Sequence, residues 1–497
     1  MMKSSDSVSL RIGSCSITAL RPGSPTMSPR NRMRMVAMLK SGWWTGCLPS
    51  IDGQSPNDKP ISFMKLMLKR STALLIPLLL AAGLWLWWQK RTVENVEPQR
   101  LAKPPTLSIL GRMPDWKSLE AQQNTITRSE FEHILSTVFA SGEGWRDFVE
   151  IGEGEARIRS TDGENAEVFA LRFAREGSTQ TPARWWRVPE ELPLAPVGKP
   201  LDGLHIAIDP GHIGGEWARI EERWFDAGDG HAICEGDLTL QVAKRLKPQL
   251  ESLGARVSLV RKKAEPVTHW RPEGLIETAR LTNENSTAPD SPIAQRKLAE
   301  RLFYRTAEIH ARADRVNQSI KPDLVLCLHF NAEAWGDPNQ PTLINRSHFH
   351  ILLNGAYSDE ELRLADHRFA MIDKLLSRSH EEETSIGIKV ADVFARMSGL
   401  PPYAYPAGST NALPVKDHPY LWARNLLANR LYQCPVIFME PYVMNSINDH
   451  TRIKLGDYDG TRDVNGTPRV SIIREYADAL AEGLKQAYAT RRAVSGL

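Results

Sequence analysis

The chain has 497 residues, of which 41% are hydrophobic and 24% are charged, a composition typical of a globular protein and not of a disordered or fibrous one. At roughly 150 residues per domain, this length predicts two or three folded units. The net charge is +3. Residues 1–63 hold eight Lys or Arg and three Asp or Glu, a balance of +5, so the rest of the chain carries −2. This weakly acidic remainder does not indicate a nucleic-acid partner.

The N-terminal part contains a leader and a candidate membrane span. Residues 1–63 are scattered Ser, Arg, Pro and Met with no usable periodicity, unlike a folded domain. Within residues 64–91, the uncharged apolar run 72–88 lies between two basic pairs and ends in tryptophans. These seventeen residues reach about 25 Å as a helix, the short end of a membrane span, and tryptophans are typical of the membrane interface. We therefore expect an uncleaved signal anchor with one transmembrane helix; a buried core helix and a cleaved signal peptide are the alternatives.

The basic residues before the apolar run predict the topology. Such residues stay on the cytoplasmic side, so everything after Arg91 is expected outside the cytoplasm, anchored in the cell envelope, or secreted if the signal is cleaved. A signal anchor usually lies near the start of a chain, which favours translation from Met64 or Met67 and makes residues 1–63 an overlong leader. The intact mass of the native protein tests that start.

The five cysteines do not indicate a disulfide framework. Cys15 and Cys47 lie in the leader, and the other three are far apart, odd in number and without CxxC spacing. Cys327 and Cys434 lie in or beside apolar runs, where a free cysteine behaves as a small hydrophobe. We expect these two and Cys234 to be structural.

A small α+β domain is predicted for residues 106–190, after a polar tether at 92–105. The apolar spacing predicts a helix over 129–139 with Ser129 as its N-cap. This domain shows no catalytic constellation, and the aromatic pair in Arg184-Trp-Trp-Arg187 is expected to be core at a domain seam, with sugar or membrane contact as the alternative. Strands are expected at about 146–151, 155–160 and 167–174.

The main domain is expected over residues 202–490, after a proline-bearing linker at 191–201. Apolar strands alternate with helical stretches, which predicts an α/β fold with a mostly parallel sheet and helices on both faces. We expect Pro248 to kink its helix or end it early. Strands are expected near 204–209, 255–260, 323–329, 347–353 and 435–440, and helices near 236–250, 294–319, 360–378, 385–398 and 471–488.

Three of these strands end on a residue that can bind a metal or move a proton. They end at or next to His212, His329 and Glu440, and because strand ends of a parallel sheet meet at one edge, the side chains can converge. A fourth candidate, Glu235, opens the helix after a long loop. One histidine after a turn is usually a surface or capping residue, whereas two imidazoles and a carboxylate around an open position form the usual catalytic zinc site.

Four stretches occur in the order and at the intervals of a known enzyme family. They are Asp-Pro-Gly-His212 with Gly214-Gly215, then Cys-Glu235-Gly-Asp-Leu-Thr-Leu, then Leu-Cys-Leu-His329-Phe-Asn-Ala332, then Pro-Val-Ile-Phe-Met-Glu440-Pro-Tyr-Val-Met-Asn445. With them, residues 202–490 resemble the zinc-dependent N-acetylmuramoyl-L-alanine amidases of bacterial cell-wall turnover, the amidase type 3 family. One such stretch is a weak signal, and four in order are a specific one.

The resemblance implies a cofactor, a substrate and a role for each candidate. It implies Zn²⁺ held by His212, Glu235 and His329, with Glu440 as the catalytic glutamate. Zinc lowers the pKa of bound water to about 7 and polarises a carbonyl, and a carboxylate can move the water proton to the departing amine. The implied substrate is peptidoglycan, cleaved in the periplasm between N-acetylmuramic acid and the L-alanine of the stem peptide. An activator protein is not identified.

The chain departs from the family pattern near these residues. His212 is followed by Ile-Gly-Gly-Glu216, and the loop to Glu235 is long and acidic, which we expect to make it a solvated flap, with a regulatory lid as the alternative. His231 or Asp237 could replace Glu235 as a ligand. The acidic residues of the loop are Glu216, Glu221, Glu222, Asp226 and Asp229.

Other residues near the motifs have no role that the sequence proves. Arg261 and Asn331 match positions of the family pattern. His348 and His350 share one face of a strand and are expected to be solvated and structural. The long segment after Arg261 and the Pro- and Tyr-rich loop 398–419 leave the substrate range open. The alternatives are a zinc hydrolase of another cell-wall amide and a metal-free wall-binding module, and the presence of all the site residues favours an enzyme.

Overall fold

The computed structural model describes residues 107–162, 166–228, 230–283, 291–334, 336–337 and 340–492. The predicted leader 1–63, signal anchor 64–91 and tether 92–105 lie outside the described residues. In the part of the chain that is described, no helix combines the length and apolar character needed to cross a membrane.

A seven-stranded sheet lies at the centre of the main domain in the described part of the chain. Its strands are β4 (His205–Pro210), β7 (Arg256–Leu259), β8 (Leu324–Leu328), β11 (Phe349–Leu353), β12 (Leu413–Pro414), β13 (Leu421–Ala423) and β14 (Val436–Pro441). They are ordered β12-β13-β11-β14-β8-β4-β7. The run from β14 to β7 is parallel, as is the β13–β11 pair, which confirms the prediction of a mostly parallel sheet. β11 is antiparallel to β14, and β12 to β13.

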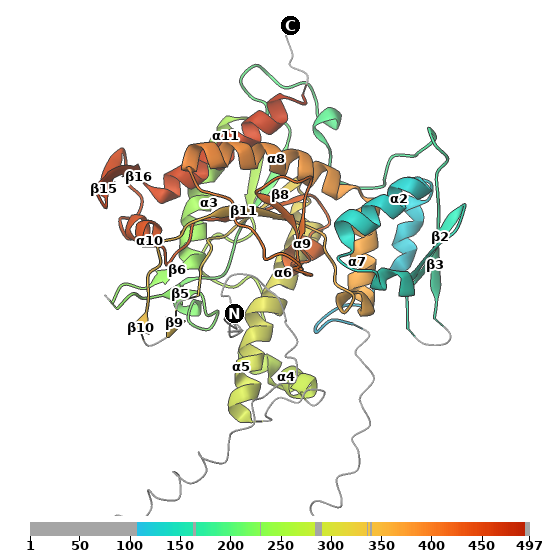
Figure 1. The fold of residues 1–497 in the computed structure, drawn as a ribbon, viewed down its shortest axis with the longest axis horizontal. Coiled ribbons are helices and arrows are strands. Elements are labelled where there is room, and N and C mark those ends of the chain that lie inside the picture. Colours follow the sequence, from blue (N-terminus) through green and yellow to red (C-terminus); the bar gives the residue numbers. More distant parts are fainter. Residues whose placement is uncertain are drawn as a thin grey trace, which may run out of the picture. The chain divides into compact units, whose positions relative to one another are not determined.

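Helices cover both faces of this sheet, as predicted (Figure 1). Side chains alternate along a strand, so Ile206 and Ile208 face one core and Ala207 faces the other. The first core contains side chains of α3 (Glu235–Ser252), α8 (Ser379–Ser398) and α11 (Ile472–Ala489), and α11 packs against the other two. The second contains side chains from α6 (Glu308–Asp314) and around α9 (Leu427–Leu431). Burial from both sides explains the continuous apolar runs of β4, β8 and β14.

The helix α3 does not end early at Pro248, which was one of the two predicted outcomes; a kink at this residue stays a prediction. It continues to Ser252 with the proline inside it. An interior proline costs about 3 kcal/mol, because it removes one backbone hydrogen bond and crowds the preceding turn. Leu246 and Leu250 lie on either side of it and are fully buried in the first core. Burial of two such side chains contributes about 3–6 kcal/mol, which outweighs the local cost.

The single helix predicted for 294–319 is interrupted by π-helical turns. It consists of α5 (Pro292–Leu302) and α6, with π turns at Phe303–Ala307 and Arg315–Ile320. A π turn inserts a residue into the helical repeat and changes which side chains face inward. The predicted helices near 360–378, 385–398 and 471–488 are α7 (Ala365–Leu376), α8 and α11, and α8 begins earlier than expected, at Ser379.

Residues 107–190 contain a second sheet and a short helix, which we call the small unit. Its antiparallel sheet consists of β1 (Val149–Ile151), β2 (Glu155–Arg159) and β3 (Val168–Arg172), near the predicted positions. Its helix, α2 (Arg128–Ile134), begins at Thr127 and not at the predicted cap Ser129, because Thr127 and Glu130 form a reciprocal capping box. The predicted end of this helix is a π turn, Leu135–Phe139.

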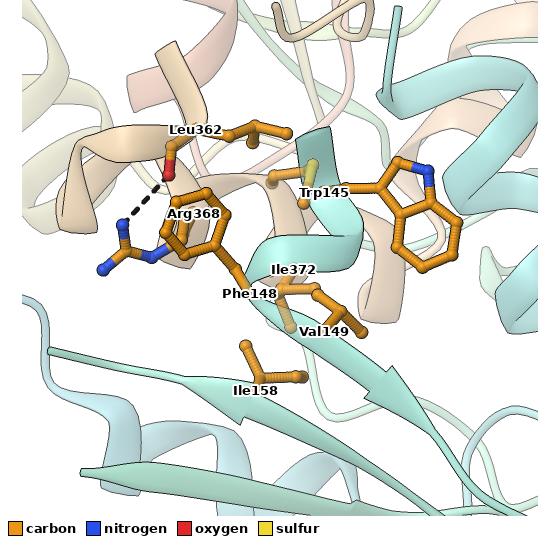
Figure 2. Close-up of a pocket in the computed structure, with 8 residues that line it drawn as sticks. Trp145, Phe148, Val149, Ile158, Leu362, Arg368 and Ile372 are labelled. Atoms are coloured by element: carbon orange, nitrogen blue, oxygen red, sulfur yellow. Dashed lines mark hydrogen bonds between the residues drawn. The ribbon is translucent and has the colours of Figure 1, made fainter. Parts of the chain in front are cut away.

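The small unit shares a hydrophobic core with α7 of the main domain. Arg368 of α7 lies with its guanidinium 4.5 Å from the ring centroid of Phe148 and donates a 2.9 Å hydrogen bond to the carbonyl of Leu362. This core therefore extends across the boundary that the sequence predicts between the two domains. Figure 2 shows the side chains that meet there: Trp145, Phe148, Val149, Ile158, Leu362, Arg368 and Ile372.

The segment between the two units packs on the main domain. Trp186 is 2% exposed and lies in the second core, which confirms the expectation that this tryptophan is core. Cys327 and Cys434 are free and buried in the same core, as predicted. Leu192 and Ala195, both in the predicted linker, are also buried.

Candidate metal and catalytic site

The structure brings His212, Glu235 and His329 together at one edge of the sheet. One candidate ligand atom from each residue lies within 4.8 Å of the others. Nε2 of His212 is 3.2 Å from Oε2 of Glu235, and Nδ1 of His329 is 3.1 Å from Oε1. The two histidines follow the adjacent parallel strands β4 and β8, and Glu235 is the first residue of α3. Both rings therefore face a single buried carboxylate.

The competing ligands named from the sequence have other positions. His231 is exposed, and it is not part of the cluster that the described residues form. Asp237 accepts a 3.0 Å hydrogen bond from the amide of Gly215, so its carboxylate supports the turn after His212.

Glu440 is the second-last residue of β14 and neighbours His329 in the sheet. In the parallel pairing of β14 with β8, Met439 lies opposite Leu328, which sets the following residues, Glu440 and His329, side by side. The ring of Phe438 stacks on that of His329 with centroids 4.3 Å apart and planes 15° apart. Glu440 is 4% exposed. The residue expected to act as the base is therefore buried and neighbours the second histidine of the cluster in the sheet register.

The pKa values of all three residues of the cluster are shifted. Burial disfavours the charged ring of His212, but Glu235 and Glu221 outweigh this effect and raise its pKa. Burial also opposes ionisation of Glu235, but the two histidines outweigh it and hold the pKa of this carboxyl well below its usual range. Burial lowers the pKa of His329. The two imidazoles thus favour the ionised form of this carboxylate.

Two buried arginines hold the turn that carries His212. Its backbone is in the left-handed region, with φ of 57°, a strained conformation for a non-glycine residue. Arg312 donates to the carbonyls of Pro210 at 2.8 Å and His212 at 2.6 Å. Arg261 donates to the carbonyls of Pro210 at 3.0 Å and Gly211 at 3.1 Å. The role of Arg261 that the sequence left open is therefore to position this turn.

Two buried carboxylates neutralise the charge of Arg312. Its guanidinium contacts Asp209 at 2.9 Å and Glu308 at 2.8 Å. The hydroxyl of Tyr432 donates to the other oxygen of Asp209 at 2.5 Å. Burial disfavours the charge of Arg312, but its two carboxylate partners outweigh this and raise its pKa. By contrast, burial and the charge of Arg312 lower the pKa of Arg261 to about 10.

Asn331, the other residue with an open role, links the loops after β8 and β14. Its side-chain amide donates to the carbonyl of Glu440 at 3.4 Å, and its backbone carbonyl accepts from Met444 at 2.8 Å. It therefore helps to fix the backbone on both sides of Glu440.

Glycines allow the loops of the site to approach each other. A Cβ on Gly211 would lie 2.4 Å from ring atoms of His329. A Cβ on Gly236 would lie 2.4 Å from the backbone nitrogen of Gly214. Both distances are far inside van der Waals contact. The glycine of Asp-Pro-Gly-His212 is thus required by the position of the second histidine.

We expect Gly211→Ala to destabilise the protein by about 1–3 kcal/mol, because the added methyl group forces the ring of His329 to move. Urea unfolding of the full chain measures the effect. Gly154→Ala is the matched control, since a Cβ at Gly154 meets nothing within 4 Å. Equal unfolding free energies for the two variants would show that the site tolerates the overlap.

The acidic loop is not a solvated flap at Glu221, contrary to the prediction. Glu221 is 1% exposed, and its carboxylate accepts hydrogen bonds from the amides of Ile213 at 2.9 Å and Gly214 at 3.0 Å. It also lies 3.6 Å from Nδ1 of His212. Glu216 is exposed, as expected. No sequence signal separates Glu221 from the other acidic residues of the loop; it is buried because the turn's amides need an acceptor.

His348 and His350 are buried as well, which corrects the expectation that they are solvated. Each is 4% exposed. Because β11 is antiparallel to β14, its first residues lie at the edge where β14 ends, and His350 pairs with Glu440 in the register. His348 Nε2 lies 3.1 Å from Glu333 Oε1. Burial and the charges of His348 and Arg424 lower the pKa of His350 far below its usual value.

No protein-family model matches the sequence, and no curated protein is significantly similar to it. Solved structures similar to the chain include the N-acetylmuramyl-L-alanine amidase Ami1 from Mycobacterium smegmatis, with 17% identity, a TM-score of 0.32, and coverage of 59% of this chain and 99% of that one. The CwlD amidase from Clostridioides difficile, in complex with the GerS lipoprotein, has 11% identity, a TM-score of 0.33, and coverage of 58% and 100%. The N-acetylmuramoyl-L-alanine amidase AmiC2 of Nostoc punctiforme has 14% identity, a TM-score of 0.30, and coverage of 58% and 99%. These values are too low to assign a reaction, so the chemistry of this chain has to follow from its own residues.

Proposed function

We propose that this protein is a zinc-dependent peptidoglycan amidase that acts outside the cytoplasm. The bond cleaved is the amide between N-acetylmuramic acid and the L-alanine of the stem peptide. The observation that carries the proposal is the cluster of His212, Glu235 and His329 beside Glu440 at one edge of the sheet. The four sequence stretches that hold these residues supply the identity of the bond.

The donor set fits zinc. Zinc–ligand bonds of about 2.0–2.2 Å place the ligand atoms of a tetrahedral site about 3.4 Å apart. The contacts of Glu235 with the two histidines, at 3.2 and 3.1 Å, are close to that spacing. Two imidazoles and one carboxylate leave the fourth position for water or substrate, as in catalytic zinc sites. Bound zinc would lower the pKa of the attacking water and polarise the amide carbonyl.

Glu440 supplies the proton transfers. Its carboxylate takes a proton from the water that attacks the carbonyl carbon, and later gives a proton to the nitrogen of L-alanine as the C–N bond breaks. The reaction needs this carboxylate beside the ligands but not on the metal, and Glu440 lies near the end of a fully buried strand, next to His329. His212, Glu235 and His329 are the residues that would hold the metal.

Digestion of purified peptidoglycan by the zinc-loaded full chain tests the reaction. We expect mass spectrometry of the soluble products to identify free stem peptides that begin with L-alanine, and we expect removal of zinc by a chelator to stop their release until zinc is restored. Products cut within the stem peptide would instead identify another cell-wall amidase. A chain that binds peptidoglycan but not zinc would be a wall-binding module.

A further inference from the structure

The two histidines of the cluster use different ring nitrogens. His212 faces Glu235 with Nε2, at 3.2 Å, whereas His329 faces the same carboxylate with Nδ1, at 3.1 Å. A neutral imidazole carries its proton on one nitrogen and a lone pair on the other, and only the lone pair can bind a metal. For His212 to bind through Nε2, its proton has to reside on Nδ1.

The group that faces Nδ1 of His212 is Glu221. Its Oε1 lies 3.6 Å from this nitrogen. The separation is a few tenths of an ångström longer than a hydrogen bond, but a carboxylate at that distance favours a proton on the nearer nitrogen electrostatically. The side chain of Glu221 is 2% exposed, so water screens this interaction little.

The same carboxylate is fixed in place by the backbone that carries the ligand. The amide of Ile213 donates to both oxygens of Glu221 at 2.9 Å, and the amide of Gly214 donates to Oε2 at 3.0 Å. Both donors belong to the two residues that follow His212. The carboxylate of Glu221 is therefore fixed to the backbone directly after the residue that carries the ring.

We propose that Glu221 is a positioning residue of the metal site: its carboxylate, 3.6 Å from Nδ1 of His212, favours the proton on that nitrogen electrostatically and so selects the tautomer that presents Nε2 to zinc. This inference rests on the proposed zinc function. Outer carboxylates of this kind orient a metal-binding histidine, and their loss lowers metal affinity about 10- to 100-fold. The ring of His329 is packed differently, because it stacks on Phe438.

Glu221→Gln separates this role from simple bracing of the turn. Glutamine has the same shape, and its single oxygen can take the place of Oε2 and accept from the amides of Ile213 and Gly214. Its amide nitrogen then takes the place of Oε1 and turns an N–H toward Nδ1 of His212, which favours the proton on Nε2. The turn keeps the two hydrogen bonds to the remaining oxygen and loses the one from Ile213 to Oε1. The ring is driven to the tautomer that cannot bind the metal through Nε2.

The test measures zinc affinity and stability in the full chain. Zinc affinity is measured by competition with a chromophoric chelator, and thermal unfolding is recorded on the metal-free protein. We expect Glu221→Gln to weaken zinc binding about 10- to 100-fold and to leave the unfolding temperature of the metal-free chain near that of the wild type. Glu216→Gln, an exposed change in the same loop, is the matched control and should bind zinc like the wild type.

The outcomes distinguish the two proposals. A wild-type chain that binds no zinc at neutral pH rejects the proposed function and the role of Glu221 together. If the wild type binds zinc and Glu221→Gln binds it equally well, only the role of Glu221 is rejected. A loss of affinity in Glu221→Gln that is matched by a lower unfolding temperature of the metal-free chain would also overturn it, because Glu221 would then only brace the turn.

Discussion

Replacement of Glu440 by Gln is expected to lower kcat for amide hydrolysis about 100- to 10,000-fold and to leave zinc binding unchanged. Glutamine has the shape of glutamate but cannot accept the proton of the attacking water. Glu440 is not part of the cluster of ligand atoms, so the metal is retained. The rate of release of stem peptides from peptidoglycan, together with the zinc content of the variant, measures both effects.

His329→Ala is the comparison, and it should lose zinc and activity together because it removes a ligand. His133→Ala, an exposed histidine on α2, controls for the loss of an imidazole and should retain both. Wild-type activity in Glu440→Gln would refute the role of Glu440 as the base. Loss of zinc from the same variant would make Glu440 a ligand instead.

Arg312→Met is expected to lower the free energy of unfolding by about 3–5 kcal/mol. The side chain of Arg312 is 5% exposed, and it faces the side chains of Asp209 and Glu308, which are 6% and 2% exposed. Methionine fills much of the same volume but leaves both buried carboxylates without the cation that contacts them. It also removes the donors that hold the carbonyls of Pro210 and His212. Urea unfolding of the full chain gives the difference.

Arg301→Met makes the same substitution at an exposed position of α5, and its effect should stay within about 0.5 kcal/mol. A loss of less than 1 kcal/mol in Arg312→Met would mean that the remaining partners suffice. These are the hydroxyl of Tyr432 for Asp209 and the amides of Val267 and Thr268 for Glu308.

The sheet and the convergence at its edge could be predicted because burial leaves a direct signal in the sequence. β4, β8 and β14 are buried on both faces, so each is a continuous apolar run, and the residue at its end stands out. Parallel neighbours then bring His212 and His329 to the same edge. Glu235 does not follow a long apolar strand, and only the sequence motif around it identified it as a candidate ligand.

The direction of β11 and the role of Glu221 could not be predicted. Side chains alternate with a period of two whether a strand is parallel or antiparallel. The spacing of His348 and His350 therefore does not indicate at which edge of the sheet they lie. Glu221 is one acidic residue among several in its loop. Only the folded turn shows which of them accepts hydrogen bonds from the backbone amides after His212. Both features depend on contacts between distant or irregular segments, which local patterns do not encode.

The core that α7 shares with the small unit determines which parts of the chain unfold together. Met371, Ile372 and Leu375 lie in that core together with Phe131 and other residues of the small unit. Opening the small unit alone would transfer these α7 side chains to water, at a cost of about 1.5–3 kcal/mol for each. The two units are thereby coupled, and heat or denaturant should melt them in one cooperative transition. A fragment cut at the predicted linker would carry an apolar patch prone to self-association.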